Sequence, residues 1–256
     1  MLLVIDVGNT NTVIGIYQDE KLVTDWRIRT ERNTTEDEFN VLVTNLFRVG
    51  RVEPRVIDKI IISSVVPPMV TILDAYCRRY LGRPPHWVNA KSYKGMKILI
   101  DNPEEVGADR IVNAVGAYQK YKKSLIVIDF GTATTFDTIA GDGSYLGGVI
   151  SPGIMIASEA LFHHASKLPR VEIFEPPDRV IGKNTQDCIK SGIIYGYAGL
   201  VDGIVERMKA EMDPVPAVIA TGGLAPLMSG VCKSIEAVES SLTLEGLRLI
   251  SSMLAD

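Results

Sequence analysis

Apolar runs alternate with short polar turns along the chain, and the first of these runs occurs twice. The stretch LLVIDVGNTNT (2–12) returns as LIVIDFGTATT (125–135), so that Asp6 matches Asp129 and Thr12 matches Thr135 at one constant offset. Each copy predicts a buried strand that ends in Asp-x-Gly, then a Thr-rich turn, a second strand and a polar turn. Such a repeat favours two copies of one fold unit over two hairpins that look alike by chance.

The same patterning predicts the remaining elements. A helix over 35–49 carries an apolar stripe, with Thr35 and Glu38 as a capping box at its start and Gly50 at its end. Residues 169–184 contain several prolines and predict a loop. Further strands are predicted at 22–28, 59–65, 86–90, 145–150 and from 217, and further helices from Pro67 or Pro68, within 102–121, and over 151–168, 185–212 and 243–254.

The order of these elements predicts an α/β protein built of two units. A chain of 256 residues has room for one large domain or two of about 120. The most polar stretch near the middle is YQKYKK (118–123), which favours a boundary there. We therefore expect an N-terminal domain at 1–118 and a C-terminal domain at 119–256.

Composition and charge narrow the class of protein. A net charge of −4 gives no basic field for nucleic acid. The three cysteines, Cys77, Cys188 and Cys232, stand far apart, as is typical of reduced thiols in a cytoplasmic protein. Asp6 interrupts the first apolar run, which disfavours a signal peptide. The apolar stretch 60–73 is short and contains two prolines, so we expect no membrane partner.

The repeated phrase favours phosphate binding. A strand ending in Asp-x-Gly places a carboxylate where the strand emerges, and the glycine lets the backbone come close to a ligand. The following Asn and Thr residues offer the hydroxyls and N–H donors that suit phosphate oxygens. A carboxylate would repel a polyphosphate unless a hard cation such as Mg²⁺ lies between them. Two such hairpins could hold a phosphate chain from both sides of a cleft.

Other phosphate motifs do not fit. IGKNT (181–185) resembles the end of a P-loop, but Asn184 stands where Ser or Thr belongs and Pro177 where the earlier glycine belongs. ATGGLA (220–225) follows an apolar strand, and its Gly-Gly turn predicts a flat wall for an adenine ring.

Taken in order, DxGNTxT, DxGTAxT and ATGG resemble the acetate and sugar kinase, Hsp70 and actin superfamily. Within it, the chain resembles the type III pantothenate kinases over nearly its whole length. The residues that carry the resemblance are IDVGNTNT (5–12), SSVVP (63–67), DNPEEVGADRIVNA (101–114), IDFGTATTFD (128–137), GGVISPG (147–153), IGKNT (181–185), SGIIYG (191–196) and ATGGLA (220–225).

The resemblance implies two similar actin-like (ribonuclease H-like) lobes, each a mixed sheet flanked by helices, with a cleft between them. It implies ATP-dependent phosphorylation of pantothenate to 4′-phosphopantothenate, the first step of coenzyme A biosynthesis. The implied cofactors are ATP with Mg²⁺ and a monovalent cation, K⁺ or NH₄⁺. The resemblance also implies a homodimer. The glycines at 192, 196, 199 and 203 share a helix face that would allow tight packing at a domain or dimer interface.

The resemblance assigns the site residues as well. Asp109 in GADR would be the general base, kept ionised by the helix dipole, and Arg110 would pair with a carboxylate. Without the family, the alternative for ADR is a charge pair at a helix start. Asp129 would bind the monovalent cation, and Asp6 would bind Mg²⁺ through phosphate or water. ATP would contact Asp6, Val7, Gly8, Asn9, Thr10, Asn11, Thr12, Val13 and Thr132, and pantothenate would contact Gly107, Ala108, Asp109, Arg110 and, from the neighbouring subunit, Thr185.

Two other functions stay open at this point. One is a non-catalytic transcription accessory factor of the same family, although a binding factor would not need the base Asp109. The other is a kinase of the same superfamily that acts on a sugar or short acid, which the GADR pocket disfavours. One residue departs from the family pattern, because Ile100 stands where relatives often carry a tyrosine that would hydrogen-bond the substrate.

Overall fold

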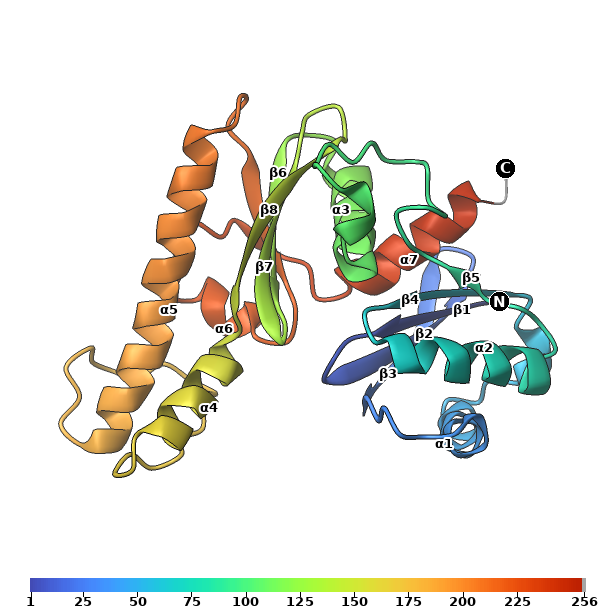
Figure 1. Cartoon of the computed structure of the whole chain (residues 1–256), viewed down its shortest axis with the longest axis horizontal. Coiled ribbons are helices and arrows are strands. Elements are labelled where there is room, and N and C mark those ends of the chain that lie inside the picture. Colours follow the sequence, from blue (N-terminus) through green and yellow to red (C-terminus); the bar gives the residue numbers. More distant parts are fainter. Residues whose placement is uncertain (255–256) are drawn as a thin grey trace. The chain divides into compact units, whose positions relative to one another are not determined.

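The computed structural model describes residues 1–254, which form two compact units (Figure 1). Unit 1 contains Met1–Lys120 and the segment from Leu242 onward, and unit 2 contains Tyr121–Ser241. The chain therefore returns to unit 1 at its end, whereas the division expected from the sequence places the closing helix in the C-terminal domain. The return is possible because this helix buries its apolar face against the sheet of unit 1 rather than that of unit 2.

Unit 1 contains a five-stranded mixed sheet in the order β3-β2-β1-β4-β5. Strand β1 runs antiparallel to β2 and parallel to β4. The strands are β1 (Leu2–Val7), β2 (Asn11–Gln18), β3 (Lys21–Arg29), β4 (Lys59–Ser64) and β5 (His86–Trp87).

Unit 2 repeats this arrangement in the order β8-β7-β6-β9-β10, with the same directions at each place. The strands are β6 (Leu125–Phe130), β7 (Ala133–Ile139), β8 (Tyr145–Pro152), β9 (Ala217–Thr221) and β10 (Ala237–Val238). Two units with the same strand order confirm the α/β class and the duplicated fold expected from the repeated phrase.

The two copies differ in the length of their first turn, and this corrects the offset read from the sequence. Asp6 lies opposite Val13 in the β1–β2 pair, whereas Asp129 lies opposite Thr135 in the β6–β7 pair. The first turn is therefore one residue longer than the second. The constant offset holds for the first strands but is wrong for the second strands, where Thr12 corresponds to Thr134 and not to Thr135.

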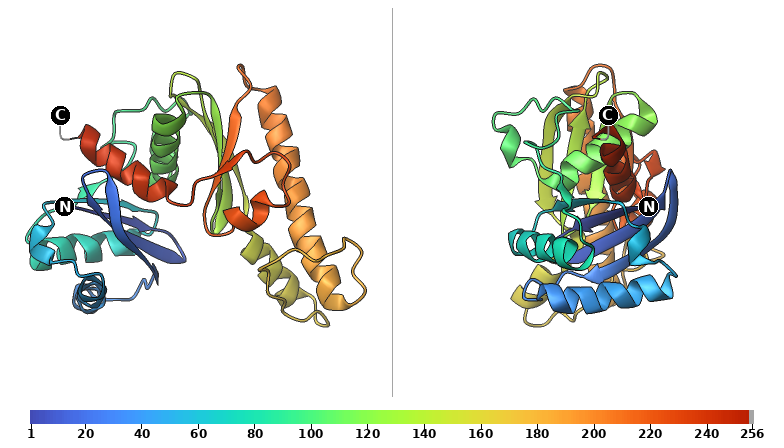
Figure 2. Two further views of the ribbon diagram at one scale, coloured as in Figure 1. Left: turned by 180° about the vertical axis from the view of Figure 1, so that it is seen from behind. Right: turned by 90° about the vertical axis from the view of Figure 1, so that its right-hand side faces the viewer.

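Helices cover both faces of the unit 1 sheet, as Figure 2 shows. Helices α1 (Glu36–Val49) and α2 (Pro67–Tyr80) bury Phe39, Val43, Leu73 and their neighbours against one face of the strands. Helix α7 (Leu242–Met253) lies on the other face, where Leu244 approaches Gly15 of β2. Helix α3 (Ala108–Tyr121) packs on α7, since Gly116 and Gly246 leave no room for a Cβ between the two helices.

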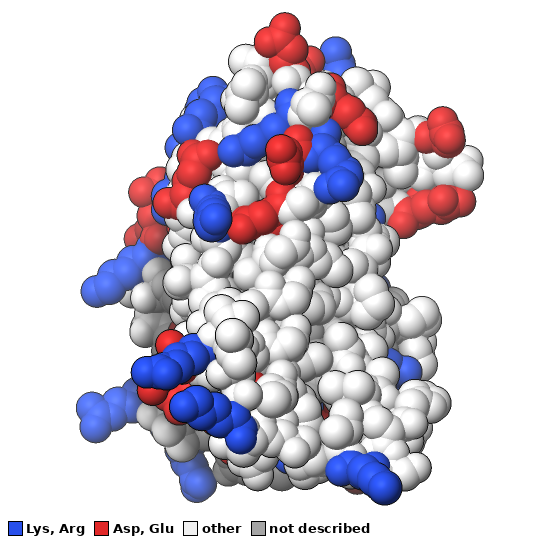
Figure 3. Space-filling view, turned by 90° about the vertical axis from the view of Figure 1, so that its left-hand side faces the viewer, with Lys and Arg blue, Asp and Glu red and all other residues white. Residues whose placement is uncertain are grey.

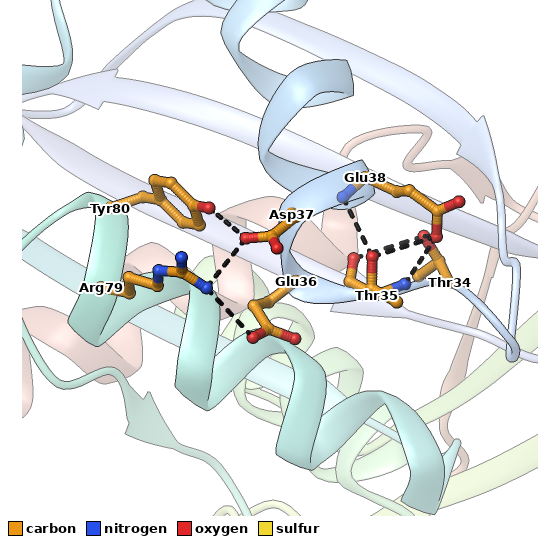
Figure 4. Close-up of polar contacts among 7 residues, drawn as sticks. All are labelled: Thr34, Thr35, Glu36, Asp37, Glu38, Arg79 and Tyr80. Atoms are coloured by element: carbon orange, nitrogen blue, oxygen red, sulfur yellow. Dashed lines mark hydrogen bonds and ion pairs between the residues drawn. The ribbon is translucent and has the colours of Figure 1, made fainter.

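The start of α1 is built as its sequence predicts (Figure 4). The Thr35 side chain accepts a hydrogen bond from the Glu38 N–H, and the Glu38 carboxylate accepts one from the Thr35 N–H at 2.9 Å. Arg79 near the end of α2 forms ion pairs with Glu36 and Asp37. The capping box satisfies the N–H groups of Thr35 and Glu38, and the ion pairs join α1 to α2.

The helices of unit 2 lie on the face of its sheet that carries Ile128 and Phe136. They are α4 (Ile154–His164), α5 (Thr185–Ala210) and α6 (Ala225–Ser229). Helix α4 is shorter than the predicted 151–168, and the entry through Pro152 is wrong. Ser151 and Pro152 end strand β8 instead, because their backbones pair with β7, and Gly153 then caps the helix. Short 3₁₀ turns at Pro54–Val56 and Pro103–Glu105, helix α6 and strand β10 are additional to the predicted elements.

Helix α5 is the one helix within residues 1–254 whose length and composition would allow it to cross a membrane. A core helix of a soluble protein passes the same test. Its residues Ile194, Val201 and Val205 are buried in the core of unit 2, so its apolar character has a packing explanation.

Candidate active site

The carboxyl ends of β1 and β4 bring Asp6 and its neighbours together in unit 1. Asp6 is the last but one residue of β1 and lies beside Ser63 of the parallel strand β4. The Ser63 hydroxyl donates a hydrogen bond of 2.6 Å to Asp6 Oδ1. The carboxylate is thus held in one orientation at the strand end, where a ligand of the following turn would meet it.

The turn after β1 is tied down by the end of β3. The Gly8 N–H donates to the Asn11 carbonyl, and the Thr30 N–H donates to the Thr10 carbonyl, both at 3.0 Å. The Thr30 hydroxyl donates to the Gly8 carbonyl at 2.7 Å and lies 2.9 Å from the Thr12 hydroxyl. Since the single proton of Thr30 is used on Gly8, Thr12 donates to Thr30. We call residues 8–11 the first phosphate turn.

The start of helix α3 lies at the same edge of the sheet. The N–H of Val65, which follows β4, donates to the carbonyl of Val7 at 3.1 Å. A Cβ placed on Gly107 would be 3.6 Å from Val65 Cγ1 and 2.5 Å from Asp109 Oδ1. The structure therefore brings Asp109 to the end of β1 and β4 that carries the first phosphate turn, and a side chain at 107 would displace its carboxylate.

The electrostatics of Asp109 differ from the expectation. The backbone N–H of Arg110 donates to Asp109 Oδ1 at 2.8 Å, as the helix-start position suggests. Burial nevertheless raises the pKa of Asp109 above its usual range, and it outweighs this hydrogen bond and the nearby Arg110 charge, which lower the pKa. The expectation that the helix dipole dominates is wrong. A raised pKa makes the ionised carboxylate a stronger proton acceptor.

Unit 2 has a corresponding edge around Asp129. Asp129 lies opposite Thr135 of β7 and beside Thr221 of β9. Gly222 has a φ of +90°, and a Cβ on it would be 2.5 Å from Asp129 Oδ1. The ATGG stretch, expected to form a wall for adenine, thus places its first glycine against the carboxylate of Asp129.

The second phosphate turn, residues 131–133, carries Thr132. The Gly131 N–H donates to the Ala133 carbonyl, and the Gly153 N–H donates to the Thr132 carbonyl, both at 3.1 Å. A Cβ on Gly153 would be only 2.2 Å from the Thr132 oxygen. Thr132 itself is exposed, as a residue that contacts a ligand must be.

Asp137 shares a face of the sheet with Asp129 but is fully buried. The Tyr145 hydroxyl donates to Asp137 Oδ1 at 2.6 Å, and the Thr135 hydroxyl donates to Oδ2 at 3.3 Å. These hydrogen bonds compensate part of the cost of burying the carboxylate. Asp137 therefore lies in the interior of unit 2, beneath Thr135, and not on a ligand-facing surface.

Thr185 lies at the first turn of α5, away from the phosphate turns in sequence. It lines a hollow of about 560 Å³ whose other lining residues are Lys167, Pro169, Asn184, Gln186 and Asp187. Asn184 caps the helix, with its side chain accepting from the Asp187 N–H. None of these lining residues belongs to either phosphate turn.

The arrangement of the acidic residues suits a cation whose ligands come mainly from phosphate and water. Among the residues that the structure describes, no group of three or more His, Cys, Asp and Glu side chains could hold a metal ion. Each phosphate turn instead follows one strand-end carboxylate, which suits Mg²⁺ bound largely by phosphate and water. Burial raises the pKa of the Cys77 and Cys232 thiols to about 12, which disfavours the reactive thiolate form.

Three residues that contact the two turns are absent from the predicted site. Thr30 and Arg32 come from the chain after β3, and Gly153 comes from the chain after β8. The Arg32 Nη2 donates a hydrogen bond of 2.9 Å to Asn9 Oδ1. Only the pairing of the third strands brings these residues to the turns, so the periodicity of the sequence carries no signal for them.

Comparison with known proteins agrees with this arrangement. A family model described as type III pantothenate kinase matches residues 2–207. The chain is 66% identical over 250 residues to a type III pantothenate kinase of Desulfatibacillum aliphaticivorans, covering 98% of this chain and 97% of that protein. It is 62% identical over 252 residues to a type III pantothenate kinase of Desulfosudis oleivorans, covering 98% and 99%.

Solved structures show the same fold at low identity. A protein of Campylobacter jejuni described as a putative Baf family transcriptional activator superposes with a TM-score of 0.60 at 17% identity, covering 99% and 98% of the two chains. A putative N-acetylglucosamine kinase of Porphyromonas gingivalis gives a TM-score of 0.54 at 12% identity, covering all of both chains. These structures confirm an actin-like fold. At such low identity they indicate nothing about the activity of this chain.

Proposed function

The chain belongs to the family of type III pantothenate kinases, and from that premise we propose how its residues carry out the reaction. It is a phosphotransferase that phosphorylates pantothenate, the first step of coenzyme A biosynthesis. A transcription accessory factor and a sugar kinase, the two other functions open from the sequence, are disfavoured by relatives of 53–66% identity that all bear the pantothenate kinase name.

ATP is the phosphoryl donor expected of a kinase, used with a divalent metal. We assign its binding to residues 6–13 and Thr132, around the two phosphate turns. Backbone N–H groups and hydroxyls would donate hydrogen bonds to the phosphate oxygens. Asp6 would hold Mg²⁺ through phosphate or water. The Ser63 hydrogen bond to Asp6 supports this role, because it leaves the carboxylate oriented before any ligand arrives.

Asp109 would accept the proton of the pantothenate hydroxyl as that oxygen attacks the terminal phosphorus. The oxygen gains a bond to phosphorus, the bond from phosphorus to the leaving oxygen of ADP breaks, and the proton passes to Asp109. Burial supports this role by raising the proton affinity of the carboxylate. Gly107 supports it as well, since the Asp109 carboxylate occupies the space that a side chain there would fill.

The remaining substrate contacts would come from Gly107, Ala108, Arg110 and Thr185. The Arg110 guanidinium suits the carboxylate of pantothenate, which it can contact through two N–H groups. Thr185 lies in the hollow at the start of α5, and we assign it to the substrate bound to a neighbouring subunit.

A homodimer is supported by the outer surface of α5. Three of its glycines, Gly192, Gly196 and Gly199, are exposed, and a Cβ on any of them would meet nothing within 4 Å. Figure 3 shows the side of the molecule that α5 covers, where uncharged side chains fill a wide area between charged groups near the top and the bottom. Such a surface suits close approach of a second helix. We also propose a cytoplasmic location, with neither membrane nor nucleic acid as a partner.

Asp129 is our candidate for a monovalent cation, K⁺ or NH₄⁺. Its neighbours across the sheet, Thr135 and Thr221, are oxygen-bearing side chains, which suit a hard cation. Asp129→Asn should therefore lose activation by K⁺, measured as the K⁺ concentration that gives half of the maximal rate.

The observation that carries the proposal is that α3 brings Asp109 to the sheet edge of the first phosphate turn. A coupled ADP-release assay tests it with ATP, Mg²⁺ and pantothenate, in the presence of either K⁺ or Na⁺. We expect ADP release that requires pantothenate and rises with K⁺. Release with a sugar but none with pantothenate would contradict the assigned substrate.

A further inference from the structure

The first phosphate turn contains one residue that the second lacks. Thr10 and Thr132 occupy equivalent places, because each carbonyl accepts a hydrogen bond from the residue that follows the third strand. Gly8 and Gly131 are likewise equivalent, since each N–H donates a hydrogen bond to the carbonyl of the last residue of its turn. Asn9 is therefore the additional residue, and its side chain holds Arg32.

The chain after the third strand also differs between the units. In unit 2, Gly153 leads directly into α4. In unit 1, Thr30 leads into a four-residue connection (31–34) before Thr35 caps α1. Arg32 lies in this connection, so Asn9 and Arg32 are both features that unit 1 alone possesses. The residue inserted in the first turn thus contacts the connection that is longer in unit 1.

The predicted nucleotide site needs a positive side chain. Residues 6–13 and Thr132 include one carboxylate, Asp6, and no Lys, Arg or His. A guanidinium carries five N–H donors in a planar fork that matches phosphate oxygens, and the contact with Asn9 uses one of them. Arg32 is exposed, so the remaining donors are accessible to a ligand of the turn.

We propose that Arg32 binds the phosphate chain of the nucleotide, and that Asn9 is a positioning residue that holds the guanidinium over the first phosphate turn. This rests on the proposed binding of ATP at that turn. Arg32 neutralises phosphate charge on the nucleotide and offsets the repulsion from Asp6. Its contribution grows with the number of phosphates that it faces, so ATP and ADP depend on it and adenosine does not.

The test compares Arg32→Gln, Arg32→Lys and Asn9→Ala with the matched control Arg55→Gln. Arg55 is exposed in the 3₁₀ turn Pro54–Val56, beside Met1 and hence at the opposite end of β1 from the turn. Nucleotide affinity is measured by calorimetry with Mg·ADP and with adenosine, and kcat and KM are measured for ATP and for pantothenate.

We expect Arg32→Gln to weaken Mg·ADP binding and raise the KM for ATP by about tenfold to a hundredfold, with adenosine affinity and the KM for pantothenate unchanged. Arg32→Lys should recover part of the loss, because the charge remains without the fork. Asn9→Ala should cause a smaller loss, and in the double variant with Arg32→Gln it should add less than it costs alone, because its effect through Arg32 is already lost. Melting temperatures should match that of Arg55→Gln, since Arg32 is exposed.

Equal Mg·ADP affinity in Arg32→Gln and Arg55→Gln would overturn the proposal. A loss that also lowers adenosine and pantothenate binding, or that follows a lower melting temperature, would make Arg32 structural and overturn it too. An additive loss in the double variant would remove Asn9 from the proposal. Failure of the wild-type protein to phosphorylate pantothenate would contradict the proposed function instead, because the calorimetric comparison does not depend on that substrate.

Discussion

The two phosphate turns share one backbone plan but differ in their polar side chains. In unit 1, Thr12 is buried and donates to Thr30, which in turn donates to the Gly8 carbonyl. In unit 2, the equivalent Thr134 is also buried, yet its hydroxyl has no hydrogen-bond partner among residues 1–254. The partner is missing because Gly153 occupies the place of Thr30, and no side chain fits there. A duplicated backbone can thus keep its register while one copy loses a hydrogen-bond relay.

The carboxylates of the two units show a parallel difference. Asp6 receives a hydrogen bond from Ser63 on the neighbouring strand. The equivalent Thr221 donates instead to the Glu239 carbonyl, and Gly222 packs against Asp129. The unit 1 edge also receives the start of α3 with Asp109. The same strand register thus carries different polar contacts in the two units, and the following variants test that difference.

The largest effect is expected from Asp109→Asn. If Asp109 is the base, kcat should fall about 10²- to 10⁴-fold, because the amide cannot accept the proton. In the wild-type protein, kcat/KM should fall as the pH drops through the raised pKa of Asp109. Glu53→Gln, an exposed carboxylate change in the same unit, is the control. Unchanged kcat in Asp109→Asn would reject the base.

The same variant has a predictable stability. Because burial raises the pKa of Asp109 in the folded state, its favourable contribution is complete below the unfolded pKa and is lost as the pH rises through the folded pKa. At a pH above the folded pKa, the ionised carboxylate therefore destabilises the fold. Asp109→Asn should melt no lower than wild type at pH 7, so a lost activity would not reflect unfolding.

Gly107→Ala should reduce activity without removing the base. The new Cβ would lie 2.5 Å from Asp109 Oδ1, so the carboxylate must move. A displacement of about 1 Å can lower kcat on the order of 10²-fold. The matched control is Gly141→Ala, where a Cβ meets nothing within 4 Å. Equal kcat in the two alanine variants would show that the close approach has no catalytic role.

Gly153→Ala should destabilise unit 2 by about 1–3 kcal/mol, because its Cβ would collide with the Thr132 and Gly131 carbonyls. Thr30→Ala at the equivalent place in unit 1 causes no such collision. It should instead cost about 1–3 kcal/mol through the hydrogen bonds that Thr12 and Gly8 lose. Urea unfolding measures both. Full stability in Gly153→Ala would contradict the tight approach of the third strand to the second turn.

The smallest effects distinguish the two buried threonines by sign. Thr134→Val should stabilise unit 2 by about 1 kcal/mol, because it removes a buried hydroxyl without a partner. Thr12→Val should destabilise unit 1 by about 1 kcal/mol, because it breaks the bond to Thr30. The two variants make the same change of atoms, so each is the control for the other. If both variants changed the stability with the same sign, the inferred difference in hydrogen bonding between Thr12 and Thr134 would be wrong.

Local patterns in the sequence were sufficient for much of the fold. The capping box at Thr35 and Glu38, the helix end at Gly50 and the start of α2 at Pro67 all lie where predicted. Each depends on contacts within about one turn of helix, which sequence spacing records directly. The entry of α4 is wrong because Pro152 pairs with β7, a contact between strands that no helix signal could reveal.

By itself, the sequence determined that the chain contains two copies of one strand-turn-strand unit, each ending its first strand in Asp-x-Gly, and that it resembles one kinase family. These features depend on residues close together along the chain or on recurrence of a motif. Tertiary structure alone decided which residues surround each turn. Strand pairing brings Thr30 and Arg32 to one turn and Gly153 to the other, and the packing around Asp109 raises its pKa, opposite to the expected direction. Burial and cross-strand contact depend on all elements at once, so their effects appear only when the chain is folded.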